Sequence, residues 1–354
     1  MNNISKISKL VEGSELDAML VTGYFNRLFA TGFSSSAGVL LITADDAWFF
    51  TDSRYEEAAG NAVSNAGIRL VTREASYAKQ IGDIIAERKI GKIGIEENDI
   101  CYSEYLDWNA KLKAELCPAQ ELLDGLRAVK SQEDLEKMIR VQRIAEKSFE
   151  EILPLISDKV TEKDLAAELI YRMMKNGADD KSFDPIIVSG ERSSMPHGAP
   201  TNEKIKKGFL TMDFGAKLNG WCSDTTRTVC IGVPTDEMKK VYDTVLAAQL
   251  AGIAAAKAGV KGCEVDGAAR GLIEKAGYGE YFGHGFGHGL GLQVHEAPTA
   301  APSAEKELPA GTVISAEPGI YLPGRFGVRI EDVIYITEGE AVNITSLPKK
   351  LLVL

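Results

Sequence analysis

The feature that most constrains this chain is a change in the pattern of its apolar residues near residue 126. Before this point, short buried-strand patterns alternate with helical patterns. After it come long amphipathic helices and strands rich in Gly, Thr and Val. The first pattern is typical of an α/β domain, and the second is typical of an α+β domain. The 354 residues are therefore predicted to form two domains, residues 1–126 and residues 127–354.

The apolar periodicity also places individual elements. In the first domain it predicts strands at 17–22, 37–43, 47–51, 68–72 and 92–96, and helices at 53–66, 77–88 and 103–112. In the second domain it predicts helices at 131–152, 161–176, 236–258 and 263–275. Ser131 is the expected N-cap of the first of these helices, because Asp134 follows three residues later, as in a capping box.

Charge and cysteine usage exclude several classes of protein. With 40 Lys and Arg against 51 Asp and Glu, the net charge is −11, so neither nucleic acid nor an anionic membrane is an expected partner. The N-terminal stretch contains Glu12 and Glu15, unlike a signal peptide. The apolar run 245–256 is too short for a membrane span. Five cysteines without a C-x-x-C pair favour a reducing, cytoplasmic location over disulfides or a thiolate zinc site.

Segment 208–232 contains a strong hairpin signal, the dipeptide Asn219-Gly220. If these residues form the turn, Asp213 lies opposite Thr226, and Asp224 lies two pairs nearer the turn on the same face. Their backbones would be about 7–8 Å apart. This spacing suits two carboxylates that converge on a pair of metal ions. Two solvated aspartates on the open face of a hairpin would give the same pattern, so both interpretations stay open.

Histidine is scarce and unevenly distributed. The chain has four, and His284, His288 and His295 lie in the glycine-rich segment GHGFGHGLGLQVHEAP, while His197 lies in SMPHGAP. A single histidine is usually a core or surface residue, but this concentration favours a functional site. Glycine at these positions lets the backbone adopt unusual dihedral angles and approach other groups closely.

Two glutamates interrupt strand-like runs in the C-terminal part. Glu317 ends the apolar run of TVISAEPGIY, where Pro318-Gly319 stops the strand, and Glu331 lies with Arg329 on one face of a strand predicted at 328–336. Each glutamate is either at an exposed strand edge or buried with a partner, since buried charges are paired or bound to metal. Together with two aspartates and one histidine, they form an oxygen-rich set that suits Mn²⁺, Fe²⁺, Co²⁺ or Zn²⁺.

The motifs MDFG, SDTTRT, GHGLGLQVHEAP, SAEPGIY and RIEDV resemble, in this order, the five metal-ligand motifs of the pita-bread metallopeptidases. That family includes aminopeptidase P, prolidase and methionine aminopeptidase. FNRLFATGFSSS and FFTDSRY resemble the creatinase-type N-terminal domain, which methionine aminopeptidase lacks. The resemblance implies an α/β creatinase-like domain followed by an α+β pita-bread catalytic domain.

The resemblance also implies a role for each site residue. Asp213 would hold one divalent ion, His288 and Glu317 the other, and Asp224 and Glu331 would bridge both. Thr226 would contact a ligand and set its orientation.

The resemblance also implies that four further residues act on the substrate. His197, His284 and His295 would contact it and take part in catalysis, and Arg329 would lie near its carboxyl side. Two ions would lower the pKa of a bound water. Glu317 would take that water's proton and pass it to the leaving nitrogen.

The implied activity is metal-dependent hydrolysis of the Xaa-Pro bond at the amino terminus of proline-containing peptides, as in aminopeptidase P. Prolidase, which cleaves only dipeptides, is the main alternative. A metal-free creatinase-like hydrolase and a non-enzymatic pita-bread binding module are further alternatives. The resemblance implies Mn²⁺ as the first choice of metal, with Co²⁺, Zn²⁺ or Fe²⁺ possible, and a homodimer.

Overall fold

A computed structural model describes residues 3–63 and 66–354 of the chain. The chain divides into two compact units, Met1–Arg127 (unit 1) and Ala128–Leu354 (unit 2). This division lies one residue beyond the boundary that the apolar pattern predicts.

Unit 1 is built on a mixed sheet of six strands in the order β4-β3-β2-β1-β5-β6. The strands are β1 (Ala18–Val21), β2 (Val39–Thr43), β3 (Ala47–Thr51), β4 (Arg69–Thr72), β5 (Lys92–Ile95) and β6 (Glu115–Pro118). β2 pairs antiparallel with β1 and β3, whereas β4, β5 and β6 join in parallel. All residues of β1, β2 and β3 are buried. The predicted α/β class and all five predicted strands are confirmed.

Six α-helices accompany this sheet in the described part of unit 1. They are α1 (Ile4–Glu12), α2 (Tyr24–Thr31), α3 (Glu56–Val63), α4 (Tyr77–Arg88), α5 (Tyr102–Lys111) and α6 (Gln120–Ala128). The periodicity predicted α3, α4 and α5, and residues 64 and 65 of the first of these predictions lie outside the described residues. It did not predict α1, α2, α6 or the edge strand β6.

Four α-helices and three short 3₁₀ helices belong to the described part of unit 2. They are α7 (Gln132–Ile152), α8 (Glu162–Lys175), α9 (Asp236–Ala255) and α10 (Gly262–Lys275), with η2 (Leu153–Leu155), η3 (Gly190–Ser194) and η4 (Gly279–Tyr281). All four predicted helices are confirmed. Ser131 caps α7 as predicted, since its hydroxyl accepts the backbone N–H of Asp134 at 3.2 Å. Among the helices of residues 3–63 and 66–354, none is long and apolar enough to cross a bilayer.

The strands of unit 2 form several small sheets. One contains β7 (Asp180–Lys181), β10 (Ala216–Leu218) and β11 (Trp221–Cys222), and another contains β8 (Ile186–Ser189), β9 (Gly208–Phe214) and β12 (Thr225–Ile231). A five-stranded sheet contains β13 (Gly287–Gly289), β14 (Glu296–Ala300), β15 (Val313–Ala316), β18 (Asp332–Tyr335) and β19 (Val342–Asn343). A separate hairpin joins β16 (Gly319–Leu322) and β17 (Phe326–Arg329).

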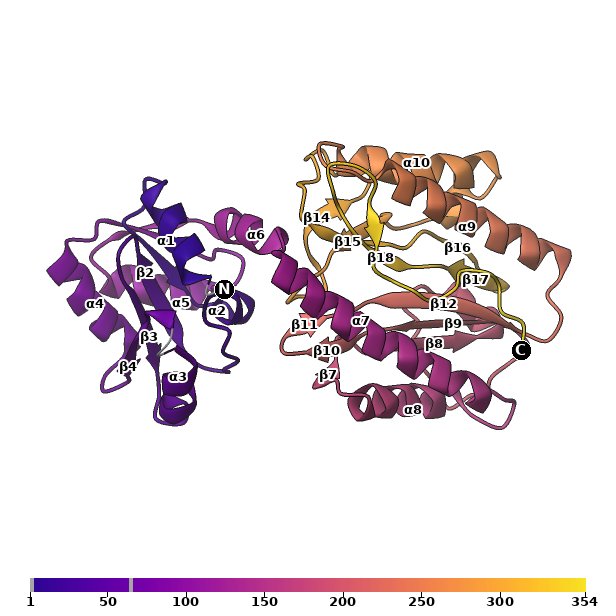
Figure 1. The fold of residues 1–354 in the computed structure, drawn as a ribbon, viewed down its shortest axis with the longest axis horizontal. Helices are drawn as coiled ribbons and strands as arrows, with labels where there is room; N and C mark the ends of the chain where they lie inside the picture. The colour runs from indigo at the N-terminus through magenta and orange to yellow at the C-terminus, as the bar shows by residue number, and fades with distance from the viewer. Residues whose placement is uncertain (1–2, 64–65) are drawn as a thin grey trace. The chain divides into compact units, whose positions relative to one another are not determined.

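Helices lie on both sides of these strands in unit 2. Figure 1 shows α9 and α10 together on one side and α7 and α8 on the other, with the strands between them. Phe209, Val245, Phe286, Ile314 and Ile320 are fully buried members of the core that α9 and α10 share with the strands. The packing of helices against antiparallel strands confirms the predicted α+β class.

The hairpin register is the one predicted from Asn219-Gly220. Both turn residues have positive φ, 51° and 84°, as a tight two-residue turn requires. Asp213 pairs with Thr226 in the β9–β12 ladder, and Leu218 pairs with Trp221 beside the turn. Asp224 therefore shares a face of the hairpin with Asp213.

The strand predicted at 328–336 is interrupted, and this part of the prediction is wrong. β17 ends at Arg329 and pairs with β16, whereas β18 begins at Asp332 and pairs with β15 in another sheet. Between them the backbone N–H of Glu331 donates to the carbonyl oxygen of Thr226 at 3.1 Å. The chain passes from one sheet to the next at this point, which places Glu331 against β12.

Candidate metal centre

All the sequence-predicted site residues except Thr226 line one cavity of about 690 Å³ in unit 2. Asp213 lies near the end of β9, Asp224 directly precedes β12, His288 is in β13, and Glu317 and Glu331 each lie between two strands. His197, His284, His295 and Arg329 line the same cavity. Residues up to 134 positions apart in the sequence are thus brought together.

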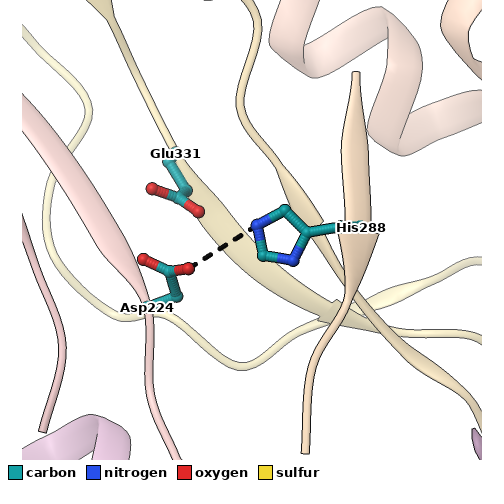
Figure 2. Close-up of side chains that lie close together, drawn as sticks. All are labelled: Asp224, His288 and Glu331. Atoms are coloured by element: carbon teal, nitrogen blue, oxygen red, sulfur yellow. Dashed lines mark ion pairs between the residues drawn. The ribbon is translucent and has the colours of Figure 1, made fainter. Parts of the chain in front are cut away.

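Asp224, His288 and Glu331 form the centre of this group (Figure 2). Each offers one ligand atom, and these atoms lie within 4.8 Å of one another. His288 Nε2 is 3.7 Å from Asp224 Oδ2. Asp224 and Glu331 are buried, and His288 is half-buried. Such a set of two carboxylates and one imidazole can hold a divalent cation.

Glu317 lies beside His288. Its Oε1 is 3.1 Å from His288 Nε2 and accepts a hydrogen bond from the Ser315 hydroxyl at 3.0 Å. Ser315 Oγ also accepts the backbone N–H of His288 at 3.0 Å. The other ring nitrogen, His288 Nδ1, is 3.1 Å from the carbonyl oxygen of Gly289, to which it donates. This bond leaves Nε2 as the nitrogen that faces the carboxylates and is available to a metal.

Asp213 and Glu331 are joined through two buried side chains. Arg329 Nη2 donates to Asp213 Oδ2 at 2.7 Å, and Arg329 Nε donates to Thr226 Oγ1 at 3.0 Å. Thr226 in turn donates to Glu331 Oε2 at 2.7 Å. Thr226, which pairs with Asp213 in the hairpin as predicted, thus also contacts the Glu331 carboxylate. Most donors of Arg329 bind protein acceptors, including the Pro196 carbonyl oxygen.

Burial, and in part the neighbouring carboxylates, raise the pKa of three of these four carboxyl groups. Burial, and then the charges of nearby carboxylates, raise the pKa of Asp224 and of Glu331 well above their ordinary values. Burial also raises the pKa of Asp213, against the effect of Arg329. For Glu317, burial acts in the same direction, but the contact with His288 prevails and lowers its pKa to about 2. Asp213, Asp224, Glu317 and Glu331 converge in this cavity beside one arginine, an arrangement that bound cations would stabilise.

Two buried carboxylate oxygens in the cavity are candidate ligand atoms for a cation. Asp213 Oδ1 and Glu331 Oε1 are buried and have no hydrogen-bond partner among residues 3–63 and 66–354. A buried oxygen without a partner costs free energy unless a proton or a cation satisfies it. Because both oxygens belong to carboxylates of the same cavity, the donor set fits hard or borderline divalent cations.

The remaining histidines lie around this centre. The rings of His295 and His288 are in edge contact, with centroids 4.3 Å apart, and His197 is exposed at the cavity wall. Burial lowers the pKa of His284, and of His295 as well. His284 Nδ1 donates to the Gly285 carbonyl oxygen at 2.9 Å, and its Nε2 accepts the Tyr321 hydroxyl at 2.9 Å.

Sequence reasoning missed Tyr321 and Ser315. Tyr321 Oη accepts from Arg329 Nη1 at 2.9 Å as well as contacting His284, and burial raises its pKa to about 12. A tyrosine in the apolar run GIYL needs a partner for its hydroxyl, which was a usable signal. Ser315 lies two positions before Glu317, and alternation along a strand places both on one face.

Cys222 lies two residues before Asp224, so the hairpin register puts its thiol on the same side as that carboxylate, but it does not line the cavity. It is buried, with Sγ 3.7 Å from the carbonyl oxygen of Leu292, and burial raises its pKa to about 12. These observations fit a packed thiol that supports the hairpin against the Gly291–Leu292 segment.

The fold and this cavity define a carboxylate-rich metal centre within an α+β unit that follows an α/β unit. Residues 136–338 match metallopeptidase family M24, and residues 3–129 match the creatinase/prolidase N-terminal domain. The chain therefore belongs to the M24 metallopeptidases.

Relatives of known structure cover nearly the whole chain. An Xaa-Pro dipeptidase from Bacillus anthracis is 39% identical, with a TM-score of 0.95 and 99% of each chain covered. An X-Pro aminopeptidase from Thermotoga maritima is 34% identical, with a TM-score of 0.91, covering 99% of this chain and 100% of the other. An Xaa-Pro dipeptidase of Pyrococcus horikoshii is 34% identical over 352 residues, which are 99% of this chain and 98% of that protein.

Proposed function

We propose that this chain is an exopeptidase that depends on two divalent metal ions and hydrolyses the Xaa-Pro bond at the amino terminus of peptides, as aminopeptidase P does. Xaa-Pro dipeptidase activity, restricted to dipeptides, has equal support from the relatives described above. The single observation that carries the proposal is the convergence of four carboxylates and His288 in one cavity with three further histidines.

In this proposal, each site residue has the role that the family resemblance implies. Asp213 would hold one ion, His288 and Glu317 would hold the other, and Asp224 and Glu331 would contribute to both. When bound, such ions lower the pKa of a water molecule and stabilise negative charge on a carbonyl oxygen. Thr226 orients Glu331 through the hydrogen bond described above.

The other residues act on protons and on the substrate. Glu317 takes the proton of the attacking water and delivers it to the prolyl nitrogen as the peptide bond breaks. His295 and His197 contact the substrate and donate hydrogen bonds toward its carbonyl oxygen. His284 and Arg329 bound the side where the proline and its carboxyl group lie. Because the Xaa-Pro bond has no N–H, the shape of the cavity must select the ring.

The finer assignments belong to this proposal as well. We choose Mn²⁺ as the first metal to test, with Co²⁺, Zn²⁺ and Fe²⁺ as alternatives, because the donor set is rich in carboxylate oxygens and has one imidazole. Five cysteines without a disulfide are consistent with a cytoplasmic protein. A homodimer is the proposed assembly, and gel filtration with light scattering tests it.

The deciding experiment compares hydrolysis of an Xaa-Pro dipeptide with that of an Xaa-Pro-Xaa tripeptide by the purified chain, in parallel with each of the four metals. Cleavage of both substrates indicates an aminopeptidase, and cleavage of the dipeptide alone indicates a dipeptidase. Creatine is included as a third substrate. Failure to cleave either peptide with any metal would refute the proposal, and turnover of creatine without metal would favour the creatinase-like alternative.

A further inference from the structure

The segment that carries His284 has little regular structure of its own. Residues 282–286 lie between η4 and β13 and read Phe-Gly-His-Gly-Phe. Glycine on either side of the histidine gives the unfolded backbone more freedom than other residues would, so ordering this segment costs additional entropy. Contacts from outside the segment must therefore fix the position of the imidazole.

Helix α10 supplies these contacts through the pair Asp266 and Arg270. The two side chains form a bidentate ion pair, with Nε 2.7 Å from Oδ2 and Nη2 3.0 Å from Oδ1. They are four positions apart, so both project from the same face of the helix. The Asp266 side chain is 2% exposed and the Arg270 side chain 19%.

The pair makes three hydrogen bonds to the backbone of the segment, at alternate residues. Arg270 Nη1 donates to the carbonyl oxygen of Phe282 at 2.9 Å, and Nη2 donates to that of His284 at 2.7 Å. Asp266 Oδ1 accepts the N–H of Phe286 at 2.9 Å. These bonds use the fixed geometry of a guanidinium, which a lysine ammonium does not reproduce.

Aromatic contacts extend this arrangement to the imidazole. The guanidinium carbon of Arg270 is 4.1 Å from the centroid of the Phe282 ring. The Phe282 ring meets the His284 ring edge to face, with centroids 5.1 Å apart. Arg270, Phe282 and His284 thus form a contact chain that runs from helix α10 to the wall of the cavity.

We propose that Asp266 and Arg270 are positioning residues that set the orientation of His284 in the cavity, through the backbone and ring contacts of residues 282–286. This inference rests on the proposed function only for its catalytic consequence. The ion pair does not line the cavity, so its effect on catalysis is indirect, and we expect it to pass through His284.

The test is a double-mutant cycle on the full-length protein loaded with Mn²⁺. Arg270→Met is made alone and in the His284→Ala background, and kcat, KM and metal content are measured with an Xaa-Pro-Xaa tripeptide. Arg270→Met alone is expected to lower kcat by roughly 10- to 100-fold, because small displacements of a catalytic group have effects of this size. In the His284→Ala background, the same substitution should lower kcat less than about threefold.

Two other variants separate positioning from general stability. Arg270→Lys keeps the charge and should recover part of the activity of Arg270→Met. Arg172→Met is the matched control, since Arg172 forms the same i, i+4 ion pair with Glu168 on α8, at 2.7 Å, without contacting the glycine-rich segment. It should leave kcat unchanged. Equal losses of kcat from Arg270→Met with and without His284 would overturn the inference.

Amide hydrogen exchange gives a readout that does not require activity. Backbone amides of residues 283–287 should exchange faster in Arg270→Met than in the wild type, while Arg172→Met leaves them unchanged. Unchanged exchange in Arg270→Met would overturn the inference even if the protein cleaved no Xaa-Pro peptide. Absence of cleavage by the wild type would instead refute the proposed function, so the two failures are distinguishable.

Discussion

Substitution of Lys130 tests how the region around His295 is held in place. Lys130 and Glu296 form an ion pair at 2.5 Å in which the side chains are 0% and 1% exposed. Lys130 Nζ also donates to the carbonyl oxygen of Ala128 at 2.9 Å. Glu296 directly follows His295 and pairs with Gly289, which directly follows His288. The ion pair is therefore next to the backbone of both histidines.

The expected cost of Lys130→Met follows from this burial. Removing one partner takes away the opposite charge nearest to the buried group that remains, and such substitutions lower the free energy of unfolding by about 3–5 kcal/mol. Unit 2 has 227 residues, from 128 to 354. For a domain of this size, 1 kcal/mol lowers Tm by about 2–4 °C, so the melting temperature of unit 2 should fall by roughly 6–20 °C.

Differential scanning calorimetry measures this change. The double variant Lys130→Met with Glu296→Leu removes both charges and should recover most of the lost Tm, because apolar replacement of a buried pair is close to neutral. Lys137→Met is the matched control, since Lys137 pairs with Glu133 at 2.9 Å on the exposed face of α7. It should cost less than about 1 kcal/mol. A single variant that melts like the wild type, or a double variant as unstable as the single one, would refute this reasoning.

Four further substitutions test the site itself. Asp224→Asn should abolish turnover and lower the metal content measured by mass spectrometry, and full activity would contradict its assignment as a bridging ligand. Thr226→Val removes the donor to Glu331 and should weaken metal binding by about 10- to 100-fold in a chelator competition, since contacts to ligands have effects of this size; unchanged affinity would exclude this role. His284→Ala should retain the metal but lower kcat by roughly 10- to 100-fold, because a group that positions the substrate is lost; loss of metal would mean that the wrong histidine was assigned as ligand. Cys222→Ala should keep both metal and activity, and a drop in metal content would indicate that the Cys222 thiolate is a metal ligand.

The parts of the fold that were predicted depend on local chemistry. The hairpin register followed from Asn219-Gly220, because a tight turn with two positive φ angles fixes which residues face each other. The capped start of α7 likewise followed from Ser131 and Asp134, which are three residues apart. In both cases the contact that determines the local structure joins residues only a few positions apart, so the structure can be predicted from the local sequence.

The parts that were missed depend on contacts between distant residues. Helix α2 begins where Glu96 accepts the backbone N–H groups of Thr22 and Gly23, more than 70 positions away. The break before Glu331 similarly depends on a bond to the backbone of Thr226. The residues of the site were predicted from the resemblance of their motifs to a known family. The contact of Tyr321 with His284 and Arg329 was found only in the structure.

The residues proposed to hold the ions span positions 213 to 331, and no single strand or loop supplies the complete set. The ligands therefore come together only after a stretch of more than a hundred residues of unit 2 has folded. An ion that binds only the closed form stabilises it by mass action, by about 4 kcal/mol when its free concentration is a thousand times Kd. The ions would thus stabilise the folded state of unit 2 as well as support catalysis. Under metal limitation, a larger fraction of the protein would be unfolded and open to proteolysis.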